Sequence, residues 1–337
     1  MGKTIYDIAK EAGVSASTVS RALNGSGYVS DAAMQRIRKA TEGYSRSPKR
    51  ITKNGKAICL VASYDPAFFF VNETYLDAMI GINSVTKEKG YNLLLEFDNE
   101  NHRCLELFNN GSIEGAILMG VSQSSSLMSA LIKHNYPFVL IGDYFDDSQK
   151  FCRVSLKDYS MAKEAVQYFI GLGHRKIGFI GGSEDYSPCK KRLNGYLSAL
   201  AEAGIEVRKE YVITCDDITP EKAVNLARRL LYQTDRVSAI LAFNDTIAFA
   251  VYEAAKALWI RIPEGLSVIG IDDSEAAKYI TPPLTTFKLP TYQKGYKAAE
   301  QLFLQMNSPK QIVENIYLDG ILMFRDSCAR PPEIPTL

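Results

Sequence analysis

The sequence lacks most of the signatures on which metalloenzymes and cofactor-dependent enzymes rely. Of its 337 residues only three are histidine and six are cysteine, and no C-x-x-C pair and no cluster of several cysteines and histidines occurs. Scattered cysteines in apolar segments fit reduced thiols better than a disulfide framework or a zinc site. The motifs G-x-S-x-G, Walker A and H-E-x-x-H are absent, and no G-x-G-x-x-G follows a strand, so we expect neither catalysis nor a cofactor.

Long apolar runs are also missing. No stretch of about 18 apolar residues occurs, and residues 1–13 contain no hydrophobic region of an export signal. We therefore expect a cytoplasmic protein without a membrane segment. The rest of the composition is ordinary, with 46% hydrophobic and 23% charged residues, which predicts a folded chain of two or three domains.

Charge is distributed unevenly along the chain. Residues 1–56 hold eleven Lys and Arg against four acidic residues, a net charge of +7, which leaves −6 for the remainder of a chain with net charge +1. A small basic module on an acidic body indicates binding to a polyanion such as nucleic acid, although a solvated charged face would give the same count.

Two short helices are predicted at the start of this basic module. Residues 4–12 place apolar side chains at helical spacing, with Thr4 as a candidate N-cap and Gly13 ending the helix. A three-residue turn then leads to a second helix over 16–23, which Ser15 can cap. This spacing is typical of the helix-turn-helix, whose second helix enters the major groove of DNA.

The second helix has an apolar and a polar face. Val19 and Leu23 can pack on the first helix, which turns Ala16, Ser17 and Arg21 outward. Short hydroxyl side chains near a helix N-terminus can donate to phosphates, and an arginine can reach O6 and N7 of guanine with two hydrogen bonds. Taken alone, the same cluster could be a capped surface helix with a solvated arginine.

The run from 7 to 24 matches D-[IV]-A-x-x-A-G-V-S-x-x-T-V-S-R-x-L-N, and it closely resembles the DNA-binding head of the lactose/galactose repressor (LacI/GalR) family. The resemblance implies that Ala16, Ser17 and Arg21 read bases. It implies that a second set touches or positions the DNA backbone: Thr4, Tyr6, Ser15, Thr18, Ser20 and Asn24. It further implies a third helix over 31–41, capped by Ser30, within a DNA-binding domain of residues 1–44.

The basic linker over 45–56 departs from the family. Family linkers usually continue as P-N-x-x-A-R-x-L and form a hinge helix that inserts a leucine into the minor groove. Here the segment is shorter and lacks the A-R-x-L. Three alternatives stay open: Ile51 could replace the leucine, the basic residues could hold phosphates, or the segment could be a disordered linker.

The body alternates short apolar runs with amphipathic helical patterns, which indicates β-α-β units and parallel sheets. The predicted strands are 57–63, 91–97, 113–119, 137–142, 176–181, 237–243 and 266–271. The predicted helices are 74–89, 124–134, 159–172, 189–203, 220–233, 245–258 and 291–306. The fold class is therefore α/β, with an all-α head and two Rossmann-like lobes. We assign 57–158 with 288–314 to the first lobe, and 159–287 with 315–330 to the second.

Ligands of open parallel sheets bind beyond the carboxyl ends of the strands, where this sequence places polar loops. Segments 173–177, 192–196, 243–245, 268–273 and 282–286 also resemble the effector-binding body of the same repressor family, which is related to periplasmic binding proteins. The resemblance implies that Arg192, Asn244 and Asp272 bind the effector, with Phe69 and Asp143 contributing from the other lobe.

These side chains suit a sugar, because Arg, Asp and Asn can bracket its paired hydroxyls as donors and acceptors. Each also has a structural alternative. Asp272 could cap a helix, Asn244 could end a strand, and Arg192 could pair with Asp185. The aromatic run 68–70 could belong to the core or to a dimer surface.

The sequence thus predicts a DNA-binding transcriptional repressor, active as a homodimer on pseudo-palindromic operator DNA and controlled by a small effector, a sugar. An enzyme that uses Asp143 with Asp272 and Asp273 is one alternative. An exported sugar-binding protein without a role in gene control is another, which the missing export signal and the basic head oppose. The tail after Cys328 has no leucine heptads, so a tetramerising coiled coil is not expected.

Overall fold

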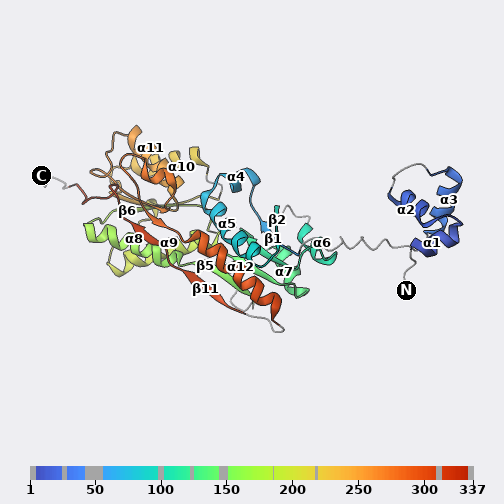
Figure 1. The fold of residues 1–337 in the computed structure, drawn as a ribbon. Helices are drawn as coiled ribbons and strands as arrows, with labels where there is room; N and C mark the ends of the chain where they lie inside the picture. The colour runs from blue at the N-terminus through green and yellow to red at the C-terminus, as the bar shows by residue number, and fades with distance from the viewer. Residues whose placement is uncertain are drawn as a thin grey trace. The chain divides into compact units, whose positions relative to one another are not determined.

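The computed structural model describes residues 5–24, 29–41, 56–97, 102–121, 125–143, 151–184, 186–216, 219–308 and 313–332. The chain divides into two compact units, residues 1–54 and 55–337, which we call the head and the body and describe separately (Figure 1). The predicted linker over 45–56 lies outside the described residues except for Lys56.

The described residues of the head form three short helices. They are α1 (Ile5–Ala12), α2 (Ala16–Asn24) and α3 (Asp31–Ala40), close to the predicted ranges. Their core contains Ile8, Val19 and Ile37, each at most 2% exposed. The prediction that Ser30 caps the third helix is wrong in one respect, because Ser30 occupies the N-cap position but its side chain makes no capping hydrogen bond.

The first lobe of the body contains a six-stranded parallel sheet in the order β11-β5-β4-β3-β1-β2. Its strands are β1 (Ala57–Ala62), β2 (Asn92–Phe97), β3 (Gly115–Met119), β4 (Phe138–Ile141), β5 (Cys152–Leu156) and β11 (Asn315–Leu318). Helices α5 (Glu73–Glu88) and α12 (Thr291–Asn307) cover one face, and α6 (Arg103–Asn109) and α7 (Ser126–Lys133) cover the other. The short helix α4 (Pro66–Val71) precedes α5.

The second lobe repeats this plan with the order β12-β10-β9-β8-β6-β7, in which only β12 is antiparallel. Its strands are β6 (Ile177–Gly181), β7 (Val212–Thr214), β8 (Ala239–Ala242), β9 (Ser267–Asp272), β10 (Thr285–Lys288) and β12 (Ile321–Met323). The paired helices α8 (Asp158–Leu172) and α9 (Ser187–Glu202) cover one face, and α10 (Pro220–Leu231) and α11 (Asp245–Ala257) cover the other (Figure 1). The 3-10 helices η1 (Lys209–Tyr211) and η2 (Glu275–Lys278) complete the lobe.

One predicted lobe assignment is wrong. Residues 315–318, predicted within the second lobe, form β11 and pair with β5 at the edge of the first sheet. The chain therefore passes between the lobes after β5, after β10 and again between β11 and β12. The strand is short and only partly buried, so its sequence lacks the continuous apolar pattern by which the central strands were predicted.

Two glycines allow α5 and α12 to touch along their backbones. A Cβ atom added at Gly81 would lie 2.2 Å from the carbonyl oxygen of Tyr292, and one at Gly295 would lie 1.9 Å from that of Ala78. Any larger residue at either position would push the two helices apart. This contact fixes the start of α12, and hence the side chains of its first turn, relative to the first lobe.

Candidate functional site

The second helix of the head presents a polar face over a buried anchor. Ser15 caps the helix by accepting a hydrogen bond from the backbone N–H of Thr18 at 3.2 Å, and its Oγ lies 2.7 Å from that of Ser17. Val19 is fully buried, whereas Ser17 and Arg21 are exposed. The polar face is thus available to a ligand of the head.

The other residues of the predicted DNA surface are placed as follows. Tyr6 is 78% exposed on α1, and Ala16, Thr18 and Ser20 are partly buried. Ala16 is therefore less outward than predicted, because it also packs against the core of the head. Thr4 lies outside the described residues, as do the side chains of Leu23 and Asn24.

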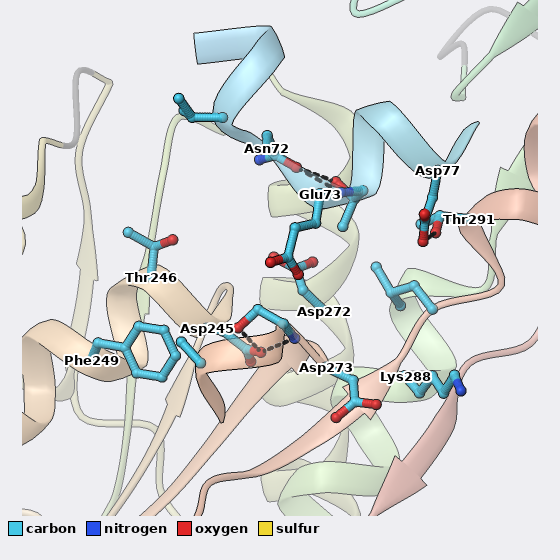
Figure 2. Close-up of a pocket in the computed structure, with 15 residues that line it drawn as sticks. Asn72, Glu73, Asp77, Asp245, Thr246, Phe249, Asp272, Asp273, Lys288 and Thr291 are labelled. Carbon is cyan, nitrogen blue, oxygen red and sulfur yellow. Dashed lines mark hydrogen bonds between the residues drawn. The ribbon is translucent and has the colours of Figure 1, made fainter. Parts of the chain in front are cut away.

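The body has a cavity of about 220 Å³ between its lobes (Figure 2). From the first lobe, the start of α5 and the first residue of α12 line it. From the second lobe, the ends of β9 and β10 and the start of α11 line it. Its charged lining is mostly acidic: Glu73, Asp77, Asp245, Asp272, Asp273 and Lys288. Of the five predicted effector residues, only Asp272 lines this cavity.

Arg192 lies on α9, buried to 4% exposure. Its Nε donates to a carboxylate oxygen of Asp158 at 2.7 Å, its Nη1 donates to the carbonyl of Phe243, and its guanidinium carbon lies 4.6 Å from the centre of the Phe243 ring. The alternative partner Asp185 lies outside the described residues. The guanidinium is therefore oriented from several sides before any ligand arrives.

Asp272 ends β9 in an unusual backbone conformation. Its φ is +144° and that of Asp273 is +56°, and such values are uncommon for residues other than glycine. The Asp272 carboxylate makes no hydrogen bond within the described part of the chain, although it lines the cavity. Burial and the nearby charge of Asp245 raise the pKa of Asp272 to about 8, despite the opposing charge of Arg192. At neutral pH the group is mostly protonated, so it can both donate and accept hydrogen bonds.

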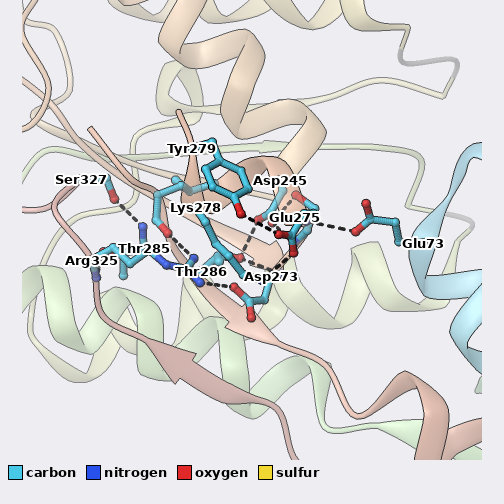
Figure 3. Close-up of polar contacts among 12 residues, drawn as sticks. Glu73, Asp245, Asp273, Glu275, Lys278, Tyr279, Thr285, Thr286, Arg325 and Ser327 are labelled. Carbon is cyan, nitrogen blue, oxygen red and sulfur yellow. Dashed lines mark hydrogen bonds and ion pairs between the residues drawn. The ribbon is translucent and has the colours of Figure 1, made fainter. Parts of the chain in front are cut away.

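Asp245 has a structural role beside this strand end (Figure 3). One carboxylate oxygen accepts from the hydroxyl of Thr286 at 2.5 Å, and the other accepts from the backbone N–H and the hydroxyl of Ser274 at 2.8 and 3.0 Å. A Cβ atom at Gly270 would lie 2.3 Å from this carboxylate. Asp273 forms an ion pair with Arg325. These contacts hold the loop after β9 in its strained conformation.

Asn244 is the N-cap of α11, and its side-chain oxygen accepts from the backbone N–H of Ile247 at 3.0 Å. It therefore begins a helix as well as following a strand. Asp143 is buried at the end of β4 and forms an ion pair with Lys191 of α9 across the lobes.

The structure does not bring Phe69 to this site. Its ring is fully buried in the core of the first lobe, 5.5 Å from those of Phe70 and Phe97. Of the two alternatives for the aromatic run, the core is therefore the one that Phe69 occupies.

A group of tyrosines at the junction of the lobes was missed by sequence reasoning. The rings of Tyr64 and Tyr75 stack at 4.4 Å, and Tyr64 and Tyr186 of the second lobe each help to raise the pKa of a neighbouring tyrosine hydroxyl. Gly120 makes room for the Tyr64 ring, which would lie 2.3 Å from an added Cβ atom. Tyr64 follows a predicted strand directly, so its position was a usable signal. Tyr75 and Tyr186 carry no such signal.

Lys294 was missed as well. It lies in the first turn of α12, and the charges of Asp158, Arg192, Asp272 and Asp143 all act on it. Close by, Glu73 accepts from the backbone N–H of Glu275 at 3.1 Å, and this contact joins the lobes (Figure 3). Within the first lobe, Thr291 of α12 donates to Asp77 of α5 at 3.2 Å. The site thus combines fixed charges, aromatic rings and an acidic cavity at the meeting of the two sheets.

Other classes of site are not found. Within the described ranges no three His, Cys, Asp or Glu side chains come together as metal ligands would, and none of the helices found there meets the length and hydropathy of a membrane span.

Comparisons with known proteins match both units. Residues 4–47 match the model of bacterial regulatory proteins of the lacI family, and residues 166–328 match a periplasmic binding protein-like domain. The "Probable HTH-type transcriptional repressor ExuR" of Bacillus subtilis (strain 168) is 32% identical over 97% of this chain and 98% of its own. The ribose operon repressor of Escherichia coli (strain K12) is 30% identical over 96% and 99%. Among solved structures, a complex of the transcriptional regulator CelR with cellobiose is 28% identical, with a TM-score of 0.75 over 96% of this chain and 99% of that one.

Proposed function

Since the chain belongs to the lacI family of bacterial regulatory proteins, we propose that its body is a sugar sensor that sets how tightly its head holds operator DNA. The predictions of family, fold class and a DNA-binding regulator controlled by a small effector are confirmed by these relatives, which are named as transcriptional repressors or regulators rather than enzymes. The nature of the effector, the contact residues, the assembly and the location in the cell are parts of the proposal.

The exposed polar face of α2 is the observation that supports this function best. Ser17 and Arg21 point away from the core because Val19 is fully buried on the opposite side of the same helix. We assign base reading to Arg21 and Ser17, with Ala16 beside them. Tyr6, Ser15, Thr18 and Ser20 contact or position the sugar-phosphate backbone.

The lobe junction supports a polyhydroxylated ligand. Arg192 offers a pre-oriented cation and Asn244 an amide. Asp272 offers a carboxyl group that has no hydrogen bond within the described ranges. Groups of this kind can bracket neighbouring hydroxyls. The ribose operon and cellobiose named for two relatives favour the sugar class.

Coupling of the two sites requires that the sugar bind one arrangement of the lobes better than another. Glu73 contacts Glu275, and Asp143 contacts Lys191, across the two lobes, so a rearrangement of the lobes would break or form these contacts. A homodimer would place two heads on a pseudo-palindromic site. Because operator DNA lies in the bacterial cytoplasm, we place the protein there.

The test is to select duplexes from a random library with the full-length protein, and then to measure the affinity for the selected duplex with and without each sugar of a panel. We expect a palindromic consensus and a change of fivefold or more for at least one sugar, since coupling energies are typically about 1–3 kcal/mol. Failure to enrich any sequence would refute the operator function. An affinity that no sugar changes would refute the sensor function.

A further inference from the structure

Lys294 lies beside the cavity between the lobes, in the first turn of α12. It lies one helical turn from Thr291, which lines the cavity, and it is partly buried. The groups that act on its ammonium are Asp158, Arg192, Asp272 and Asp143, which come from both lobes. Within the described part of the chain, the ammonium group of Lys294 has no hydrogen bond and no ion pair within 4 Å.

The other charges around it already have partners. Arg192 is paired with Asp158, and Lys191 with Asp143. Asp245 accepts three hydrogen bonds, and Asp273 is paired with Arg325. Within the described residues, Lys294 and Asp272 are thus partly buried ionisable side chains of this junction whose hydrogen-bonding capacity is unused, whereas Lys288, which also lacks a partner there, is exposed.

Lys294 and Asp272 do not hydrogen-bond to one another. They form no ion pair, and burial favours the neutral form of each, because it raises the pKa of Asp272 to about 8 and lowers the pKa of Lys294. A protonated Asp272 needs no cation and can hydrogen-bond to hydroxyls. The first turn of α12 adds the partial positive charge of a helix N-terminus beside Lys294. Among the described residues, Lys294 is thus a partly buried cation beside the cavity that no carboxylate pairs with.

We propose that the effector is an acidic sugar with one carboxylate, of the uronic or aldonic acid class, and that Lys294 binds this carboxylate. Arg192, Asn244 and Asp272 then bind its hydroxyls. This assignment rests on the proposed sensor function and specifies its ligand. A sugar phosphate carries close to two negative charges at neutral pH, which a single ammonium matches less well.

The experiment compares matched ligands on the full-length protein by calorimetry: glucose, glucuronate, gluconate and glucose 6-phosphate, and the galactose series in the same way. We expect at least one carboxylate to bind about tenfold or more tightly than its neutral parent, as one charge-assisted hydrogen bond allows. Lys294→Met, which keeps the length of the side chain, should remove this preference without weakening the neutral sugar. Lys294→Arg should retain most of it.

Lys297→Met provides the matched control. Lys297 lies one turn further along α12, is exposed and pairs with Glu300 at 2.8 Å, so its removal changes the charge of the helix by the same amount outside the cleft. The carboxylate preference should survive this change. Thermal melting of all three variants reports whether they remain folded.

The outcomes separate this inference from the function on which it rests. A neutral sugar that binds more tightly than its acid and alters operator affinity would overturn the acidic ligand and leave the sugar sensor standing. A preference for the phosphate would overturn the carboxylate. A carboxylate preference unchanged in Lys294→Met would remove Lys294 from the site. Binding of no sugar in any class would refute both.

Discussion

Arg192 and Asp158 form a buried ion pair in which Nε of the arginine lies 2.7 Å from a carboxylate oxygen of the aspartate, and both side chains are almost inaccessible to solvent. Asp158 begins α8 and Arg192 lies on α9, so the pair ties together the two helices that cover one face of the second sheet. It also fixes the guanidinium for its proposed role in ligand binding.

Replacing Asp158 with Asn should therefore both destabilise the body and lower its affinity for the ligand. Removing one partner of a buried pair leaves an uncompensated charge, at a cost of about 3 kcal/mol. Urea denaturation of the body checks this expectation. Glu202→Gln, which breaks the exposed Lys163–Glu202 pair, should change the unfolding free energy little. An equally small effect at Asp158 would show that Arg192 does not depend on it.

Arg21→Ala should reduce discrimination between the selected operator and single-base variants by about 1–3 kcal/mol while leaving ligand binding intact. The reason is that Arg21 offers two hydrogen bonds to one guanine from the exposed face of α2. Lys39→Ala on α3 removes the same charge from an exposed position, and it should weaken all duplexes uniformly. A gel-shift series measures both. Unchanged discrimination in Arg21→Ala would exclude Arg21 from base reading.

Gly295→Ala should destabilise the body by about 1–3 kcal/mol, because its Cβ atom would lie 1.9 Å from the carbonyl oxygen of Ala78 and neither backbone can yield. The gain in helix propensity, about 1 kcal/mol, opposes this effect but is smaller. Gly171→Ala in α8, where nothing lies within 4 Å of the added atom, should instead stabilise the protein. Thermal melts of the two variants should thus shift in opposite directions.

Asp272 should make the stability of the body fall as the pH rises from about 4 to about 8. Its pKa is raised from an ordinary value of 3.8 to about 8, so in this range the unfolded chain has lost a proton that the folded chain keeps. Ionisation then favours the unfolded state. Asp272→Asn removes this term, and its stability should be less dependent on pH over that range. Denaturation at pH 5 and pH 8 gives the comparison, and identical slopes for both proteins would contradict the expectation.

The regular parts of this fold were predictable because their cause is local. The buried side of α2 follows from the helical spacing of its apolar residues, among them Val19. The central strands β1, β3, β6 and β8 follow from continuous apolar runs. Strand β5 was not predicted, because Arg153 and Ser155 interrupt its apolar pattern although both are buried in the sheet. Such burial depends on neighbours from distant segments, which periodicity does not report.

The residues of the candidate site likewise fall into those that the sequence indicates and those that only the fold brings together. Arg192, Asn244 and Asp272 could be proposed from the sequence because they lie in segments that resemble the family's effector-binding body. Lys294 could not, because in the sequence it is one polar residue of an amphipathic helix. It reaches the cleft only because the chain returns from β10 to the first lobe, and because Gly295, the next residue, seats α12 directly on α5.

The return of the chain to the first sheet at β11 also governs the order in which the protein can be completed during synthesis. The head can fold as soon as it leaves the ribosome, since its contacts are local. The first lobe cannot complete its folding at that stage, because α12 and β11 are translated after nearly all of the second lobe. Until then the apolar face of α5 stays uncovered, so a ribosome stalled after β10 carries a nascent chain prone to aggregation.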